Sequence, residues 1–161
     1  MFHPVHQFRI VPCLNPQYLQ AATGDYVSFK NVAEGWVVVN VNKVGANAVV
    51  ISPFQSINVA GTAAKAISNG VNYWYSNEML TDETLTQQST TPGTTVTLSA
   101  SSGYKMAILQ IDPGVFDSAG STAFDCLTIQ VSGGTTDDTI AVNYLLKMRF
   151  QESDTPATIT N

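Results

Sequence analysis

Three carboxylates could bind a metal ion or act as acids, because Asp112, Asp117 and Asp125 flank a single loop of the chain. Oxygen-rich loops of this kind can hold Ca²⁺, which takes six to eight oxygen ligands. Their spacing does not fit the EF-hand pattern, however, and an Asp followed by Pro-Gly, as at 112–114, is ordinary turn chemistry. We therefore predict turns here rather than a metal site, and Ca²⁺ binding by the 112–125 loop stays an open question.

The histidines and cysteines form no recognisable metal or catalytic motif. His3 and His6 flank Pro4, which argues against a helix that would bring both imidazoles to one face, and no third ligand stands beside them. Cys13 and Cys126 are far apart and match no metal-ligand spacing. We predict two free thiols that behave as small buried hydrophobic residues. The sequence thus predicts no metal and no cofactor.

No catalytic motif stands out either. The Gly-x-Ser-x-Gly pattern of serine hydrolases is absent, and the stretch 61–65 lacks the second glycine and the Ser or Thr of a phosphate loop. Two carboxylates for glycoside cleavage would have to lie roughly 5–10 Å apart, and nothing marks out such a pair among the 12 acids. We predict that the protein is not an enzyme. The least favoured alternative is a lyase or hydrolase that uses acids such as Asp112 and Asp125.

The aromatic run Tyr73-Trp74-Tyr75 is the clearest candidate for contact with a partner. In a strand, Tyr73 and Tyr75 share one face and Trp74 lies on the other. One face then packs on the core while the other is partly exposed. Tyr and Trp are enriched as anchors of protein interfaces, so core packing, an interface and a platform for stacking sugars are all open for this run.

The composition excludes several classes of partner. The chain has 161 residues and a formal net charge of −5, and only 12% of its residues are charged, about half the usual fraction. Seven scattered basic residues offer no footprint for a nucleic acid. No apolar run approaches the ~18–20 residues of a membrane span, and the start Met-Phe-His-Pro-Val-His lacks the features of a secretion signal. We expect neither nucleic acid nor membrane as a partner.

Alternation with a period of two predicts β-strands along most of the chain. β-Branched and aromatic residues alternate with polar ones between Gly, Ser, Thr and Asn. The expected strands cover 26–30, 35–42, 47–58, 72–75, 94–100, 104–111, 124–132 and 139–150. Seven or eight strands joined by short polar turns predict an all-β fold, an antiparallel β-sandwich or jelly roll, in a single domain.

Some strands carry more detailed expectations. The run 35–42 is apolar enough for burial on both faces. The segment 47–58 is expected to be its hairpin partner, with Pro53 at an edge or a bulge. The loop 133–138 is expected to join the last two strands as a hairpin. Leu127, Ile129 and Val131 share one face of their strand, and in the last strand one face carries Val142, Tyr144, Leu146, Met148 and Phe150.

The two ends fall outside the strand pattern, so we divide the domain 1–161 into an N-terminal arm (1–24), a β-sandwich core (25–150) and a short polar C-terminal tail (151–161). The arm holds three prolines and lacks clean alternation. A frayed terminus and an arm lying along a neighbouring subunit are both open; the second would cover apolar side chains that are poorly left in water. The predicted interface residues are Phe2, Val5, Phe8, Ile10, Tyr73, Trp74 and Tyr75.

A series of short motifs runs through most of the chain in a fixed order. It comprises GDYVSFK at 24–30, the apolar strand 36–41, VAGTAAKAI at 59–67, ILQID at 108–112, FDCLTI at 124–129 and NYLL at 143–146. From about residue 24 to residue 150 this series resembles a widespread group of tailed-phage structural proteins, mostly treated as head decoration (capsid cement) or minor capsid proteins. Relatives in this group often close with an arginine-tyrosine tail, whereas this chain runs Met-Arg-Phe-Gln-Glu.

The resemblance implies a β-rich protein bound outside an icosahedral head, on the major capsid protein, as trimers at local three-fold axes. A charge-poor β-sandwich suits this task, because trimerisation links modest contacts into a multivalent clamp. The expected location is the outer capsid surface of the virion, after assembly in the host cytoplasm, where free cysteines stay reduced. The alternative is a glycan- or receptor-binding β-sandwich module of a tail or virion-surface protein, based on the run 73–75 and the loop 112–125.

Overall fold

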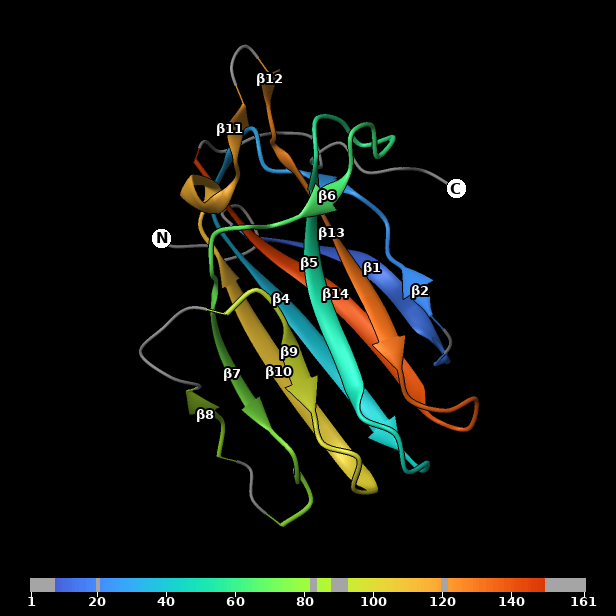
Figure 1. Cartoon of the computed structure of the whole chain (residues 1–161). Helices are drawn as coiled ribbons and strands as arrows, with labels where there is room; N and C mark the ends of the chain where they lie inside the picture. The colour runs from blue at the N-terminus through green and yellow to red at the C-terminus, as the bar shows by residue number, and fades with distance from the viewer. Residues whose placement is uncertain (1–7, 20, 82–83, 88–92, 120–121, 150–161) are drawn as a thin grey trace.

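Two antiparallel six-stranded sheets pack face to face as a β-sandwich, which confirms the predicted fold class (Figure 1). The structure is a computed structural model and describes residues 8–19, 21–81, 84–87, 93–119 and 122–149. Within these ranges, no helix is long and apolar enough to cross a membrane.

The first sheet has the strand order β1-β14-β4-β10-β7-β8. These strands are β1 (Phe8–Tyr18), β14 (Thr139–Met148), β4 (Val32–Lys43), β10 (Gly103–Ile111), β7 (Asn72–Ser76) and β8 (Thr86–Gln87). The second sheet has the order β2-β13-β5-β6, with β3 added beside β13 and β9 beside β5. Its strands are β2 (Ala22–Thr23), β13 (Cys126–Gly133), β5 (Val49–Ser56), β6 (Lys65–Ala66), β3 (Val27–Ser28) and β9 (Val96–Leu98). Two short strands, β11 (Ser118–Ala119) and β12 (Thr122–Ala123), pair with each other outside both sheets.

The core lies between the sheets, and it is filled by every second side chain of the strands on either side. The inward side chains of β14 are the ones that the sequence placed on one face, and Val142, Tyr144 and Leu146 are fully buried. On the facing sheet, Leu127 and Ile129 of β13 are also fully buried. Complete burial of a Val, Leu or Ile side chain stabilises the fold by about 1.5–3 kcal/mol. The predicted inward faces of these two strands are therefore confirmed.

The expectation of two buried faces for 35–42 is wrong. In β4 the side chains of Val37, Val39 and Val41 are at most 1% exposed, whereas Trp36 and Val38 are only half-buried. The second sheet covers one face of β4, and within this chain no described element covers the other (Figure 1). β4 is instead the centre of its sheet, paired with β10 on one side and β14 on the other.

Both predicted hairpins are wrong as well. β5 pairs with β13 rather than with β4, so the connection 44–48 crosses from one sheet to the other. The loop 133–138 crosses in the same way, because β13 and β14 belong to different sheets. Figure 1 shows β5 and β13 lying over β4 and β14. Alternation identifies a strand and its buried face, but strands that follow each other in sequence need not pair.

Pro53 occupies a central strand rather than the expected edge or bulge. It lies opposite Ile129 of β13. On its other side, β9 pairs with β5 as far as Ile51 and β6 begins at Phe54. The missing N–H of proline therefore falls at the gap between two short partners, which is why the ladder tolerates it.

Part of the predicted arm 1–24 belongs to the sandwich instead, because residues 8–18 form β1 at one edge of the first sheet. β1 pairs antiparallel with β14, and its register shifts between Pro12 and Leu14 and again between Leu14 and Gln17. Val11, Cys13 and Leu14 are buried in the core. A strand with such register shifts and prolines does not alternate cleanly, which is why the sequence pattern did not predict β1. Residues 1–7 and 150–161, with Phe150, lie outside the described ranges.

Candidate interaction surface

The solvent side of the first sheet carries an unusual number of apolar side chains. They alternate with the buried residues of β1, β14, β4, β10 and β7, so they point away from the core. We define the outer face as Phe8, Ile10, Glu34, Trp36, Val38, Asn40, Trp74, Tyr104, Met106, Ile108, Ala141, Asn143, Leu145 and Lys147; all of these are half-buried or exposed. The exposed large apolar residues among them are Ile10, at 73%, and Tyr104, at 51%.

The strand register gathers these side chains into rows across the sheet. Ile10 lies opposite Leu145, and Leu145 lies opposite Trp36. The rings of Trp36 and Phe8 are 6.3 Å apart. Side chains directly opposite on one face of an antiparallel pair have Cβ atoms about 4.5–5.5 Å apart, so these rows form continuous apolar surface.

A second row runs almost the full width of the sheet. Val38 of β4 lies opposite Asn143 on one side and Ile108 on the other, and Ile108 lies opposite Trp74 of β7. Three of these four side chains are apolar. Contiguous apolar patches beyond a few hundred Å² mark sites of association in soluble proteins.

The outer face carries almost no charge. Glu34 and Lys147 are register partners at one end of it, on β4 and β14. The Glu34 Oε1 atom also accepts a hydrogen bond from the Gln110 side chain. Because one acid and one base cancel, the face is formally neutral on a chain whose net charge is −5.

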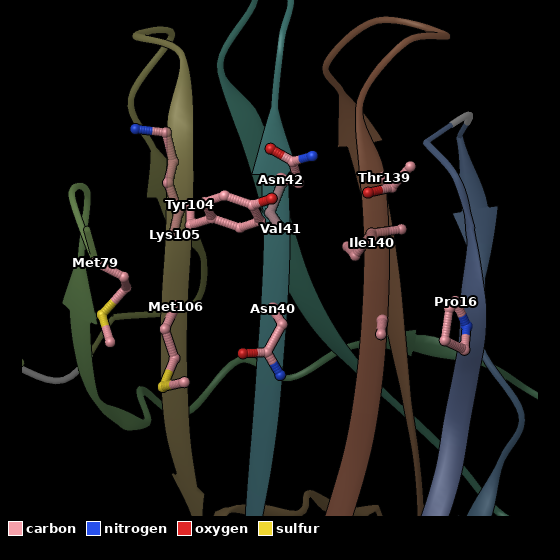
Figure 2. A pocket seen from close by; sticks show the side chains of 11 residues that line it. Pro16, Asn40, Val41, Asn42, Met79, Tyr104, Lys105, Met106, Thr139 and Ile140 are labelled. Carbon is pink, nitrogen blue, oxygen red and sulfur yellow. The ribbon is translucent and has the colours of Figure 1, made fainter. Parts of the chain in front are cut away.

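A shallow hollow of ≈ 270 Å³ lies at the opposite end of this face. Figure 2 shows Tyr104 reaching from β10 towards Asn42 of β4, with Met106 and Asn40 side by side next to it. Other lining residues include Pro16, Met79 and Thr139. Most of the exposed lining is apolar, and an aromatic ring beside two amides and a hydroxyl can stack against a ring-shaped ligand that carries a few polar groups.

The structure divides the predicted interface residues into three groups. Phe8, Ile10 and Trp74 belong to the outer face. Tyr73 and Tyr75 point to the other side of β7, where they pack against the core with their rings stacked 6.5 Å apart. The predicted split of the run 73–75 between two faces is confirmed. Phe2 and Val5 lie outside the described residues.

Sequence reasoning missed the centre of the surface. Trp36, Val38, Ile108 and Leu145 were assigned to strands but not to an interface. The available signal is that both faces of 35–42 are apolar, a pattern that also predicts burial on both sides. An apolar outer face on an open sheet produces the same pattern.

The carboxylates of the loop 112–125 have structural partners. The Asp112 Oδ1 atom accepts from the Gly114 N–H (2.7 Å) and caps a short 3-10 turn, which confirms its predicted turn role. Asp125 Oδ1 accepts a 3.1 Å bond from the thiol of Cys126. Within the described ranges no group of three His, Cys, Asp or Glu side chains is placed to hold a metal ion.

Asp117 is the most heavily bonded of the three carboxylates. Its Oδ2 atom accepts from Lys65 Nζ (2.7 Å) and Gln55 Nε2 (2.8 Å), and its Oδ1 atom accepts from Ser68 Oγ (2.7 Å). The Asp117 N–H donates to Gln55 Oε1 in return (2.8 Å). The hydrogen bonds from Lys65 and Ser68 lower the pKa of this carboxyl. Asp117 thereby anchors the loop to the second sheet.

Both cysteines are free and buried, as predicted. Burial is the main cause that raises the pKa of Cys13 to about 11 and that of Cys126 to about 12. A thiol is reactive as the thiolate, so neither group is activated as a nucleophile.

A buried lysine, Lys105, lies near the start of β10. Lys105 is 2% exposed, and its Nζ atom donates to the backbone oxygen of Asn77 (2.8 Å) and to the hydroxyls of Ser99 (2.9 Å) and Ser101 (3.0 Å). Burial lowers its pKa. These bonds fix two loops near the hollow.

Comparison with known proteins finds similarity among solved structures. No family model matches the sequence, and no curated protein matches it. The chain is similar to the crystal structure of the SPBc2 prophage-derived protein YomS, with 9% sequence identity and a TM-score of 0.48, over 86% of this chain and 91% of that chain. A similarity of this size does not establish a function.

Proposed function

We propose that this protein is a non-enzymatic phage structural protein that decorates and stabilises an icosahedral head. It binds the outer surface of the major capsid shell as a trimer, in the virion, after assembly in the host cytoplasm. The observation that carries the proposal is the neutral, apolar outer face of the first sheet, which includes Ile10, Trp36 and Ile108 and suits the packing of equivalent copies against one another on a shell. The resemblance of the motif series at 24–150 to head decoration proteins supports it.

The physical argument starts from the rigidity of the sandwich. A binding surface on regular strands is already ordered before it meets a partner, so little conformational entropy is lost on binding. Burial of apolar area contributes roughly 25 cal/mol per Å², without the directional needs of a charged surface. When many equivalent copies bind side by side and contact one another, their modest individual affinities combine into a much stronger overall attachment.

The test uses heads that lack the protein. Purified protein is mixed with undecorated heads over a range of concentrations, and the particles are imaged by electron microscopy. The expected result is saturable extra density on the outside of the shell, at local three-fold axes. Absence of binding at every concentration up to saturation would overturn the proposal.

The hollow beside Tyr104 favours a second candidate function, a glycan- or receptor-binding module. Its ring, the amides of Asn40 and Asn42 and the hydroxyl of Thr139 line one concave site. A glycan screen with and without Ca²⁺ tests this alternative. Binding that is lost in Tyr104→Ala and retained in Tyr18→Ala, a change at another exposed tyrosine, supports it. A silent screen leaves decoration as the favoured function.

A further inference from the structure

The outer face of the first sheet points to a specific occupant, and we infer that it is a second copy of this chain. The inference rests on the proposed function in one respect, since it gives a binding role to the same face. It adds that the contact made there joins copy to copy. Attachment to the shell then uses another part of the molecule.

The size of the face matches what a stable contact between copies needs. Strands lie about 4.8 Å apart and rise about 3.3 Å per residue, so four strands of about nine residues present roughly 600 Å² in projection. The four long strands β1, β14, β4 and β10 have between 9 and 12 residues each. Specific interfaces begin at about 600 Å² per partner, or about 1,200 Å² in total.

The charge of the face favours an identical partner. Two copies of a chain with a net charge of −5 repel each other over most approaches. The outer face is the exception, because it carries one acid and one base, Glu34 and Lys147, side by side at one end. A copy that docks there meets no excess of like charge. An acidic or basic partner would gain nothing from this surface.

The side chains of the face also fit a protein interface better than a solvated sheet. Trp36 and Trp74 are of the type that anchors interfaces, and Ile108 lies between Val38 and Trp74 in the same row. Ile10, on the edge strand, leaves 73% of its surface in water when the chain is alone. Contact with a second copy would cover all of these side chains at once.

The experiment measures the mass of the full chain in solution by analytical ultracentrifugation. Wild-type protein is expected to sediment as an oligomer that dissociates on dilution. The variant Ile108→Lys places a charge in the middle of the face and is expected to raise the dissociation constant by about 30-fold or more. Ile10→Lys, at the exposed edge, changes the same face without touching the core. It is expected to weaken association in the same direction.

The matched control is Val44→Lys, which adds the same charge at a 59% exposed valine in the loop after β4, outside the face. It is expected to leave the oligomer unchanged. A wild-type chain that stays monomeric at the highest soluble concentration overturns the inference. So does an oligomer that both face variants leave intact, or one that Val44→Lys weakens equally.

These outcomes are separate from a failure of the proposed function. A monomer that still decorates heads overturns the copy-to-copy contact and leaves decoration standing. An oligomer that the face variants dissociate, but that binds no heads, supports the contact and overturns decoration.

Discussion

Lys43 and Asp138 form a fully buried ion pair that joins the two connections between the sheets. Their Nζ and Oδ2 atoms are 2.6 Å apart, and both side chains are 0% exposed. Asp138 Oδ1 also accepts from the N–H groups of Val44 (2.6 Å) and Gly45 (2.8 Å), and Oδ2 accepts from that of Thr135 (2.8 Å). One carboxylate thus links the start of the loop 44–48 to the loop 133–138 at Thr135.

Removing the negative charge of this pair is expected to destabilise the fold strongly. Asp138→Asn leaves the Lys43 ammonium buried without its counter-charge, and breaking a buried pair in this way costs about 3–5 kcal/mol. The free energy of unfolding, measured in urea, reports this cost. Asp137→Asn is the control, because the neighbouring Asp137 is exposed and should change stability little. Equal stability of the two variants would contradict a structural role for the pair.

Asp138 also predicts an acid-dependent loss of stability. Burial raises the pKa of this carboxyl, but hydrogen bonds from Lys43, Gly45, Val44 and Thr135 together lower it well below its ordinary value. The unfolded chain has a pKa of about 3.9 at such a group. The contribution of Asp138 to the free energy of unfolding is therefore complete at pH values above the pKa of the unfolded chain. It is lost as the pH falls towards the pKa of the folded protein.

The unfolding free energy of the wild type should fall between about pH 4 and about pH 2, and the fall should be shallower in Asp138→Asn. Urea titrations at a series of pH values measure both slopes. Parallel slopes in the two proteins would show that other carboxylates govern acid unfolding.

Both thiols are expected to react slowly in the folded protein. The pKa values of about 11 for Cys13 and about 12 for Cys126 leave almost no thiolate at about pH 8, and burial blocks access to reagents. Titration with a disulfide reagent should detect two thiols in guanidinium chloride and react with neither quickly in buffer. Rapid modification of one thiol under native conditions would contradict this prediction, and single Cys→Ser variants would identify which one.

Calcium is expected to leave the stability of the protein unchanged. The oxygen atoms of Asp117 already accept from Lys65, Gln55 and Ser68, and Asp112 caps its own turn. A ligand that binds only the folded state raises the melting temperature with its concentration. Thermal unfolding with Ca²⁺, and with sodium chloride at equal ionic strength, should give the same midpoint. A Ca²⁺-specific rise that Asp117→Asn abolishes would establish a metal site in the loop.

The sequence predicted the parts of the fold that depend on local alternation. β10 and β14 lie close to the expected ranges 104–111 and 139–150, and Val142, Tyr144 and Leu146 face the core as expected. Pairing could not be predicted in the same way, because it depends on contacts between distant segments. The hydrogen bonds from the N–H groups of Val44 and Gly45 to Asp138 span more than 90 residues, and no local sequence pattern predicts them.

The candidate surface was predicted only at its margins. Ile10 is predicted because it is an apolar residue in a segment without clean alternation, and Trp74 because it belongs to an aromatic run. Trp36 and Leu145 were missed, because an apolar residue in a regular strand looks the same whether it faces the core or an open sheet. The strand register was needed to place Ile10, Leu145 and Trp36 in a single row.

The prolines of β1 have a consequence for how this protein avoids fibrous aggregation. β1 is an edge strand, and an unpaired edge is a template to which further strands can add without limit. Pro12 and Pro16 have no N–H to donate to such a strand, the Asp25 N–H already donates to the carbonyl of Cys13 (2.9 Å), and the register is shifted around Leu14. At the opposite edge, β8 spans only two residues. Both edges of the first sheet therefore disfavour the addition of strands from another molecule.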